Sequence, residues 1–233
     1  DCLWTGCVPS KALIASARLA HAMRNARRLG LTGVAPRHAF QEVMARMRAA
    51  RGQVARHDDP ARFRKMGVGV HFGTARFLGP GTLEVEGVGR ACSRRIVLAT
   101  GAAPTIPPIP GLEQAGFLTH STAFDQDALP TSLVMLGGGP IGLELAQVYR
   151  RLGARVTVVE MLPEILPREE ATVAAELRRI LEAEGIAFVL GEKVLDGEQV
   201  AQGLGHLGVR RPFADSGKAR SGRRAARTRP RCR

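Results

Sequence analysis

The sequence predicts an α/β protein whose second half is built around a parallel β-sheet. Between residues 132 and 190, short runs of β-branched and aliphatic residues alternate with longer stretches in which apolar residues recur at helical spacing. A glycine-rich segment lies directly between the first of these strands and the first helix. The part before residue 111 instead combines two long helical patterns with a few short strands. Because strands that alternate with helices usually pair in parallel, we expect a βαβαβ sheet in the second half.

Two helices and three short strands are expected in the first half. The first helix spans residues 10–28, with Ser10 as a candidate N-cap. The second helical pattern spans residues 38–66, and Asp59-Pro60 is a candidate break within it. Beyond that pattern, glycine-bounded apolar runs predict strands at residues 68–72, 82–86 and 95–99.

A proline-rich linker separates the two halves. Residues 104–111 read Pro-Thr-Ile-Pro-Pro-Ile-Pro-Gly, which cannot be helical, so we place a domain crossing there. The strands expected after it are residues 133–136, 155–160 and 186–190. The helices expected between them are residues 140–152 and 169–184.

The composition bounds the class of protein. With 233 residues, of which 45% are hydrophobic, the chain is long enough to bury a sizeable core. It contains no run of about 18 apolar residues, so no membrane-spanning helix is expected. No charged-then-apolar leader opens the sequence, and we therefore expect a cytoplasmic location. Four cysteines are too few for a disulfide scaffold of this size, so a close pair indicates redox or metal chemistry.

The net charge of +13 is concentrated at the end of the chain. Ten lysines and arginines lie between Arg210 and Arg233, together with a single acid, Asp215. Hydrophobic periodicity also stops after about residue 194, so residues 195–233 are expected to form a basic tail that is disordered or translated out of frame. A nucleic-acid-binding arm is the alternative, because arginine neutralises phosphates.

The glycine-rich segment has the features of a dinucleotide-binding turn. Gly137 permits a tight turn, Gly139 lets the backbone approach a pyrophosphate, and Gly142 lets the helix pack closely on the strand. Pro140 suits the first helical turn, where no donor is lost. Glu160, at the end of the next strand, would accept hydrogen bonds from a ribose diol and repel a 2′-phosphate, which favours NAD over NADP. The alternative is that these glycines form only a tight turn.

Cys2 and Cys7 are the second candidate site. Five residues of regular helix rise about 7.5 Å, which exceeds the usual Cα separation of a disulfide. The pair can therefore bridge only if the segment is distorted, and Gly6 is where that would happen. On spacing alone the two cysteines are equally compatible with a structural or metal-binding role, although no further cysteine or histidine lies close by. A thiol near the start of the following helix would be stabilised as a thiolate.

Three motifs, in order, resemble class I pyridine nucleotide–disulfide oxidoreductases, the family of dihydrolipoamide dehydrogenase, glutathione reductase and mercuric reductase. The segment Asp1–Lys11 resembles the family's redox-active motif, Ile96–Gly101 its second flavin contact, and Gly137–Glu144 its nicotinamide-nucleotide fingerprint. The resemblance covers residues 1 to about 194. It implies a partial FAD-binding domain of helices and a small β-meander at residues 1–111. A Rossmann-like NAD(P)-binding βαβαβ domain, incomplete, is implied at residues 112–194.

The resemblance also implies roles for single residues. Cys7 would lie against the flavin as the charge-transfer thiolate, Cys2 would exchange with the substrate, and Lys11 would pair with Glu144. Electrons would pass between NAD(P)H, FAD and the Cys2–Cys7 disulfide. The residues expected to contact FAD or NAD are Lys11, Ala75, Thr100, Gly101, Gly137, Gly139, Pro140, Ile141, Gly142, Glu144, Glu160 and Val194.

The expected substrate is a small-molecule or protein disulfide, a lipoamide-like dithiol, or Hg(II). Complete members of the family carry an earlier flavin fingerprint and a later interface domain that forms a homodimer. No segment of this sequence resembles either, so the chain alone is expected to bind FAD poorly and to turn over little. Two alternatives stay open: a catalytically silent nucleotide-binding fragment, and a nucleic-acid-associated protein acting through the basic tail. We expect no bound metal, no membrane association and, on balance, no nucleic-acid partner.

Overall fold

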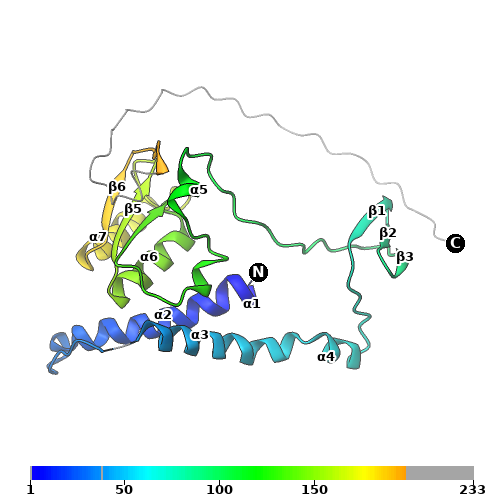
Figure 1. Ribbon diagram of the computed structural model, residues 1–233, viewed down its shortest axis with the longest axis horizontal. Helices are drawn as coiled ribbons and strands as arrows, with labels where there is room; N and C mark the ends of the chain where they lie inside the picture. The colour runs from blue at the N-terminus through cyan, green and yellow to red at the C-terminus, as the bar shows by residue number, and fades with distance from the viewer. Residues whose placement is uncertain (1, 38, 198–233) are drawn as a thin grey trace. The chain divides into compact units, whose positions relative to one another are not determined.

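The computed structural model of the chain describes residues 2–37 and 39–197 (Figure 1). The described residues form two compact units. Unit 1 comprises residues 2–55 and 103–197, and unit 2 comprises residues 56–102. The basic tail predicted at residues 195–233 lies almost wholly outside the described residues.

The first part of unit 1 is helical. It contains α1 (Cys2–Thr5), α2 (Cys7–Arg24), the 3₁₀ helix η1 (Ala26–Leu29) and α3 (Phe40–Ala55). Helix α2 buries Leu13, Ala17 and Ala20, which recur at helical spacing. The helix therefore forms where the apolar pattern predicts it, but it begins at Cys7, and Ser10 is not its N-cap. The Ser10 hydroxyl instead donates a hydrogen bond to the Cys7 carbonyl, 3.3 Å away, within the first turn of the helix.

The second part of unit 1 is a three-stranded parallel sheet with the order β4-β5-β6. Its elements are β4 (Ser132–Leu136), α6 (Pro140–Leu152), β5 (Arg155–Glu160), α7 (Ala171–Ala183) and β6 (Ala187–Leu190). In the parallel ladders Leu133 pairs with Val156, and Val158 pairs with Phe188. The predicted βαβαβ pattern is confirmed, with the strand and helix bounds within two residues. Two short elements, α5 (Leu112–Ala115) and η3 (Ala123–Asp125), precede the sheet.

One continuous hydrophobic core joins the helices to the sheet. Met44 and Met47 of α3 are fully buried, as are Leu13 of α2 and Tyr149 of α6. Burial would leave the phenolic hydroxyl of Tyr149 unsatisfied if it had no partner, but it donates to the Ala123 carbonyl 3.1 Å away. The core therefore holds α2, α3 and α6 against one another within unit 1, as Figure 1 shows.

Unit 2 combines short helices with an antiparallel meander. It contains η2 (Arg56–Asp58), α4 (Pro60–Lys65), β1 (Ala75–Gly79), β2 (Thr82–Val85) and β3 (Gly89–Cys92), with the strands in the order β1-β2-β3. The predicted break at Asp59-Pro60 is confirmed. Asp59 caps α4, because its carboxylate accepts a 2.7 Å hydrogen bond from the amide of Ala61, and Pro60 occupies the first helical turn.

Two strands predicted from the sequence are wrong. Residues 68–72 and 95–99 are irregular, whereas the strand predicted at 82–86 is present as β2. A strand needs a hydrogen-bonding neighbour, and neither run pairs with a strand of the described meander, whose order is β1-β2-β3. The apolar residues that suggested strands are exposed instead: Phe72 is 72% exposed and Val97 is 87% exposed.

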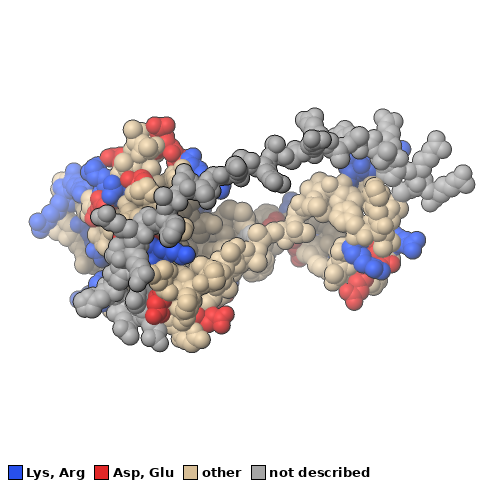
Figure 2. All heavy atoms as spheres, turned by 90° about the horizontal axis from the view of Figure 1, so that it is seen from above, with Lys and Arg blue, Asp and Glu red and all other residues tan. Residues whose placement is uncertain are grey.

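On the visible face of unit 1, acidic and basic side chains are interspersed, and basic ones gather at its left-hand edge (Figure 2). Within the described part of the chain, no helix is both long enough and apolar enough to cross a membrane.

Candidate functional site

The two cysteines lie on either side of a break in the first helix. Gly6 separates α1 from α2, with φ of −140° and ψ of −114°, which no helical residue adopts. The break brings the Cα atoms of Cys2 and Cys7 to 4.6 Å, and the two residues form a disulfide. The prediction that the segment must be distorted at Gly6 for the pair to bridge is therefore confirmed. Both cysteines are exposed, so other thiols have access to the disulfide.

Arg51 holds the segment between the cysteines, which the sequence did not indicate. From α3, its guanidinium donates a 3.1 Å hydrogen bond to the Trp4 carbonyl and lies over the Trp4 ring, 5.2 Å from the ring centroid. Its position is also fixed by Asp125, 4.0 Å away. The pairing joins residues far apart in the sequence, so no local pattern would have revealed it.

Lys11 connects this segment to the second half of the chain. Its ammonium nitrogen lies 2.7 and 2.9 Å from the two carboxylate oxygens of Glu144. The pair implied by the family resemblance is therefore present. Both side chains are largely exposed, so the ion pair contributes little to stability. It does, however, join α2 to α6.

The glycine-rich turn leads from β4 into α6. Gly137 has φ of +105°, in the region that favours glycine. A Cβ atom on Gly142 would lie 2.7 Å from the Gly137 carbonyl oxygen, so only glycine allows the turn to pack so closely on the helix. A Cβ on Gly139 would meet no atom within 4 Å. Gly139 caps α6 and Pro140 follows in its first turn, so the backbone amides at the helix start are accessible from that open side.

Glu160 is fixed beside this turn. One of its carboxylate oxygens accepts a 2.7 Å hydrogen bond from the Gly138 amide, and the other accepts a 2.9 Å hydrogen bond from the Leu162 amide. The side chain is buried. Each carboxylate oxygen has a second lone pair, so the group retains capacity to accept a hydroxyl donor.

A cavity of about 1030 Å³ opens at the turn. Gly137, Gly139, Pro140, Ile141 and Gly142 line one end of it, and it continues along β4 to residues 104–120. Two features of this end of the cavity fit a dinucleotide: a glycine without neighbours and a helix N-terminus. Glu160 lies beside the turn but does not line the cavity.

The remaining candidate residues are placed as follows. Ala75 begins β1, and Thr100 and Gly101 follow the meander; all three belong to unit 2. Val194 is buried in unit 1, after β6. The candidate flavin contacts therefore fall on two units. No group of three or more metal-ligating side chains occurs in the ranges 2–37 and 39–197.

A family model described as pyridine nucleotide-disulphide oxidoreductase matches residues 1–211 of the chain. The chain belongs to this family. It is 35% identical over 208 residues to dihydrolipoyl dehydrogenase of Bacillus subtilis, covering 83% of this chain and 43% of that protein. It is 36% identical over 190 residues to mercuric reductase of Streptomyces lividans, covering 79% of this chain and 40% of that protein.

A solved structure supports the fold. The HOCl-induced flavoprotein disulfide reductase RclA from Escherichia coli, in its Cu(II) complex, matches with a TM-score of 0.68 and 26% identity. The match covers 84% of this chain and 41% of that chain. The fold is therefore α/β, as predicted, and of the kind found in this family. The chain spans about two fifths of the length of these relatives.

Proposed function

We propose that the chain is the dithiol- and nucleotide-carrying part of a flavin-dependent oxidoreductase that passes electrons between NADH, FAD and the Cys2–Cys7 pair. One observation carries the proposal. An exposed disulfide lies at the start of α2, and one turn later Lys11 pairs with Glu144 on the helix that begins at the glycine-rich turn. Family membership supports the same chemistry.

The dithiol would act by thiol–disulfide exchange. In the reduced form, the Cys2 thiolate attacks one sulfur of a substrate disulfide, and the second substrate sulfur leaves as a thiolate. The Cys7 thiolate then attacks Cys2 Sγ, which releases the first substrate sulfur and restores the Cys2–Cys7 disulfide. Two electrons thus pass to the substrate, and the reverse sequence oxidises a dithiol. When bound, FAD would supply the two-electron exchange between this pair and the nicotinamide.

The glycine-rich turn would bind the nucleotide, and Glu160 would select it. A pyrophosphate would accept hydrogen bonds from the amides at the start of α6, on the open side of Gly139. The carboxylate of Glu160 would accept hydrogen bonds from a ribose diol and repel a 2′-phosphate, so we prefer NAD to NADP.

The substrate we propose is a disulfide or dithiol, such as a lipoamide-like molecule or a protein disulfide, with Hg(II) as the other candidate. Relatives named dihydrolipoyl dehydrogenase and mercuric reductase match at similar identity, which supports a disulfide or dithiol substrate and Hg(II) alike. By resemblance to the family, the complete protein would act as a homodimer.

The test of the dithiol uses the purified chain and dihydrolipoamide. We expect the wild-type chain to gain two reactive thiols, and Cys2→Ser or Cys7→Ser to gain none. Cys92→Ser is the matched control, because Cys92 is exposed and belongs to unit 2; it should still gain two. A chain whose disulfide resists dihydrolipoamide would contradict the proposed exchange.

The test of the nucleotide site needs no flavin. In fluorescence titrations, NADH should bind about tenfold or more tightly than NADPH, since one close like-charge contact costs at least that factor. Equal affinities would refute the role of Glu160. If NADH binds but never reduces the dithiol after FAD is added, the chain by itself is a silent nucleotide-binding fragment.

A further inference from the structure

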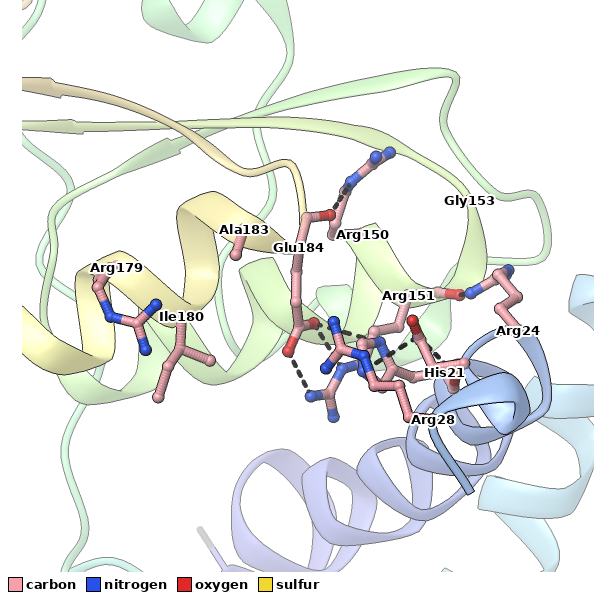
Figure 3. Close-up of a pocket in the computed structure, with 11 residues that line it drawn as sticks. His21, Arg24, Arg28, Arg150, Arg151, Gly153, Arg179, Ile180, Ala183 and Glu184 are labelled. Carbon is pink, nitrogen blue, oxygen red and sulfur yellow. Dashed lines mark hydrogen bonds and ion pairs between the residues drawn. The ribbon is translucent and has the colours of Figure 1, made fainter. Parts of the chain in front are cut away.

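A basic cavity of about 540 Å³ lies in unit 1, at the ends of three helices (Figure 3). Arg24 and Arg28 line it from the end of α2 and the turn that follows, Arg150 and Arg151 from the end of α6, and Arg179 and Glu184 from the end of α7. Helix α2 begins at the disulfide and α6 begins at the glycine-rich turn. The cavity is therefore at the opposite end of both helices. By the helical rise, it lies about 25 Å from the disulfide and about 16 Å from the glycine-rich turn.

The charge of the cavity is unbalanced. Five arginines line it, with a single carboxylate, Glu184. That carboxylate is already engaged by Arg151, whose Nη2 and Nε donate hydrogen bonds of 2.6 and 2.7 Å to its two oxygens. Arg179 is paired outside the cavity, with Glu176. The other three guanidinium groups, those of Arg24, Arg28 and Arg150, form no ion pair with a carboxylate of the described residues.

Two of these three arginines, Arg24 and Arg150, stabilise helix ends. Arg24 donates a 2.7 Å hydrogen bond to the Arg151 carbonyl, and Arg150 donates a 2.8 Å hydrogen bond to the Glu184 carbonyl. Cations at helix C-termini complement the exposed carbonyl groups. Arg28 does not stabilise a helix end in this way, because its guanidinium makes no hydrogen bond or ion pair with any other residue in the described ranges. Each guanidinium has five N–H donors, so Arg24 and Arg150 also retain donors.

We propose that this basic cavity binds a small anion that carries two or more phosphate groups. Guanidinium groups match phosphate oxygens in charge and in their planar, two-pronged geometry. The arginines that keep unused donors come from the end of α2, the 3₁₀ helix that follows it and the end of α6, so a ligand would be held by more than one element. The volume exceeds what a single phosphate fills. This site is separate from the proposed oxidoreductase function and does not depend on it.

His21 provides a reporter inside the cavity. Its Nδ1 lies 3.7 Å from a carboxylate oxygen of Glu184. Burial lowers the pKa of His21, Glu184 opposes this, and the charges of Arg151, Arg28 and Arg24 lower the pKa further. A bound polyanion would offset the arginine charges and raise the pKa of His21.

The test uses the full chain with inorganic pyrophosphate as the probe. Calorimetric titration at constant ionic strength should give saturable binding, about tenfold or more tighter than that of orthophosphate, because a second charged group gains further charge-assisted hydrogen bonds. By NMR, the pKa of His21, assigned with a His21→Gln variant, should rise when pyrophosphate saturates the chain.

The deciding comparison is between neighbouring arginines. Arg28→Met should weaken pyrophosphate binding by about tenfold or more. Arg27→Met removes the same charge from the same 3₁₀ helix but does not line the cavity, so its affinity should equal that of the wild type. Equal weakening by both variants would show general surface attraction and overturn the proposal, as would a His21 pKa that does not move. Failure of the dithiol or nucleotide tests would leave this result unaffected.

Discussion

Replacing Glu184 by glutamine should destabilise unit 1 substantially. The Glu184 side chain is only 9% exposed and its partner Arg151 is 16% exposed. Both carboxylate oxygens accept hydrogen bonds from that guanidinium, and one also accepts from Gln147 at 2.9 Å. Glu184→Gln keeps the size of the side chain but removes its charge and replaces one acceptor with a donor that faces the guanidinium. Arg151 would then be a nearly buried cation without a counter-ion.

The expected loss is about 2–3 kcal/mol in the free energy of unfolding. Removing one partner of a fully buried ion pair costs about 3–5 kcal/mol. We place this pair lower because the cavity beside it admits water to Arg151, and because the remaining amide oxygen still accepts one hydrogen bond. At about 2–4 °C per kcal/mol for a chain of this size, the melting temperature should fall by about 4–12 °C.

Urea unfolding followed by far-ultraviolet circular dichroism would measure this, with Glu176→Gln as the matched control. Glu176 lies on the same helix and forms an ion pair with Arg179, but both side chains are more than half exposed. Its loss should leave the unfolding midpoint nearly unchanged. If Glu184→Gln behaved like Glu176→Gln, the ion pair would contribute nothing measurable and the reasoning from burial would fail.

The ion pair of Glu184 and Arg151 should also make the stability of the chain depend on pH. Burial alone would raise the pKa of Glu184, but the hydrogen bonds and charge of Arg151 outweigh it and hold the pKa below its ordinary value of 4.5. A lowered pKa in the folded state means that the carboxylate stabilises the fold fully above pH 4.5 and progressively less as the pH falls through the folded-state pKa. The stability difference between the wild type and Glu184→Gln should therefore narrow below that pH, and a constant gap would contradict this account.

Two further predictions concern the core and the turn. Tyr149 is the single tyrosine of the chain, and burial raises its pKa above 10.0. In an ultraviolet titration, its phenol should therefore ionise at a higher pH in the native chain than in the chain unfolded in urea. Coincident titration curves would contradict its burial. Gly142→Ala places a methyl group 2.7 Å from the Gly137 oxygen and should cost about 1–3 kcal/mol and weaken NADH binding. Gly52→Ala within α3, where a Cβ meets nothing within 4 Å, should instead stabilise the chain by about 0.5–1 kcal/mol, and a loss as large as that of Gly142→Ala would refute the steric argument.

The sequence predicts unit 1 far better than unit 2, for a physical reason. The elements from β4 to β6 fold on one another, so each apolar run has its partners nearby in the chain, and the predicted strands appear with nearly the predicted bounds. The runs at 68–72 and 95–99 have equally strong local patterns. A strand also requires a neighbour that supplies hydrogen bonds, and an apolar pattern does not reveal whether one is present.

The features of the candidate site also differ in how far the sequence predicts them. Local geometry predicted that a Cys2–Cys7 bridge requires a distorted segment, with Gly6 as its place, and that Gly142 packs closely on the strand. That the two cysteines bridge was implied by the family resemblance. The pairing of Lys11 with Glu144 was implied by the family resemblance. The contact of Arg51 with Trp4 and the convergence of arginines at the basic cavity join segments far apart in the sequence, and only tertiary packing brings them together.

Helices α2 and α6 explain how a dithiol and a nucleotide turn can be held at a fixed separation by this chain. The disulfide is at the start of one helix and the glycine-rich turn at the start of the other, and the two helices pack side by side through buried residues such as Leu13 and Tyr149. The exposed pair of Lys11 and Glu144 contributes too little energy to fix that arrangement. The core therefore sets the distance between the disulfide and the glycine-rich turn.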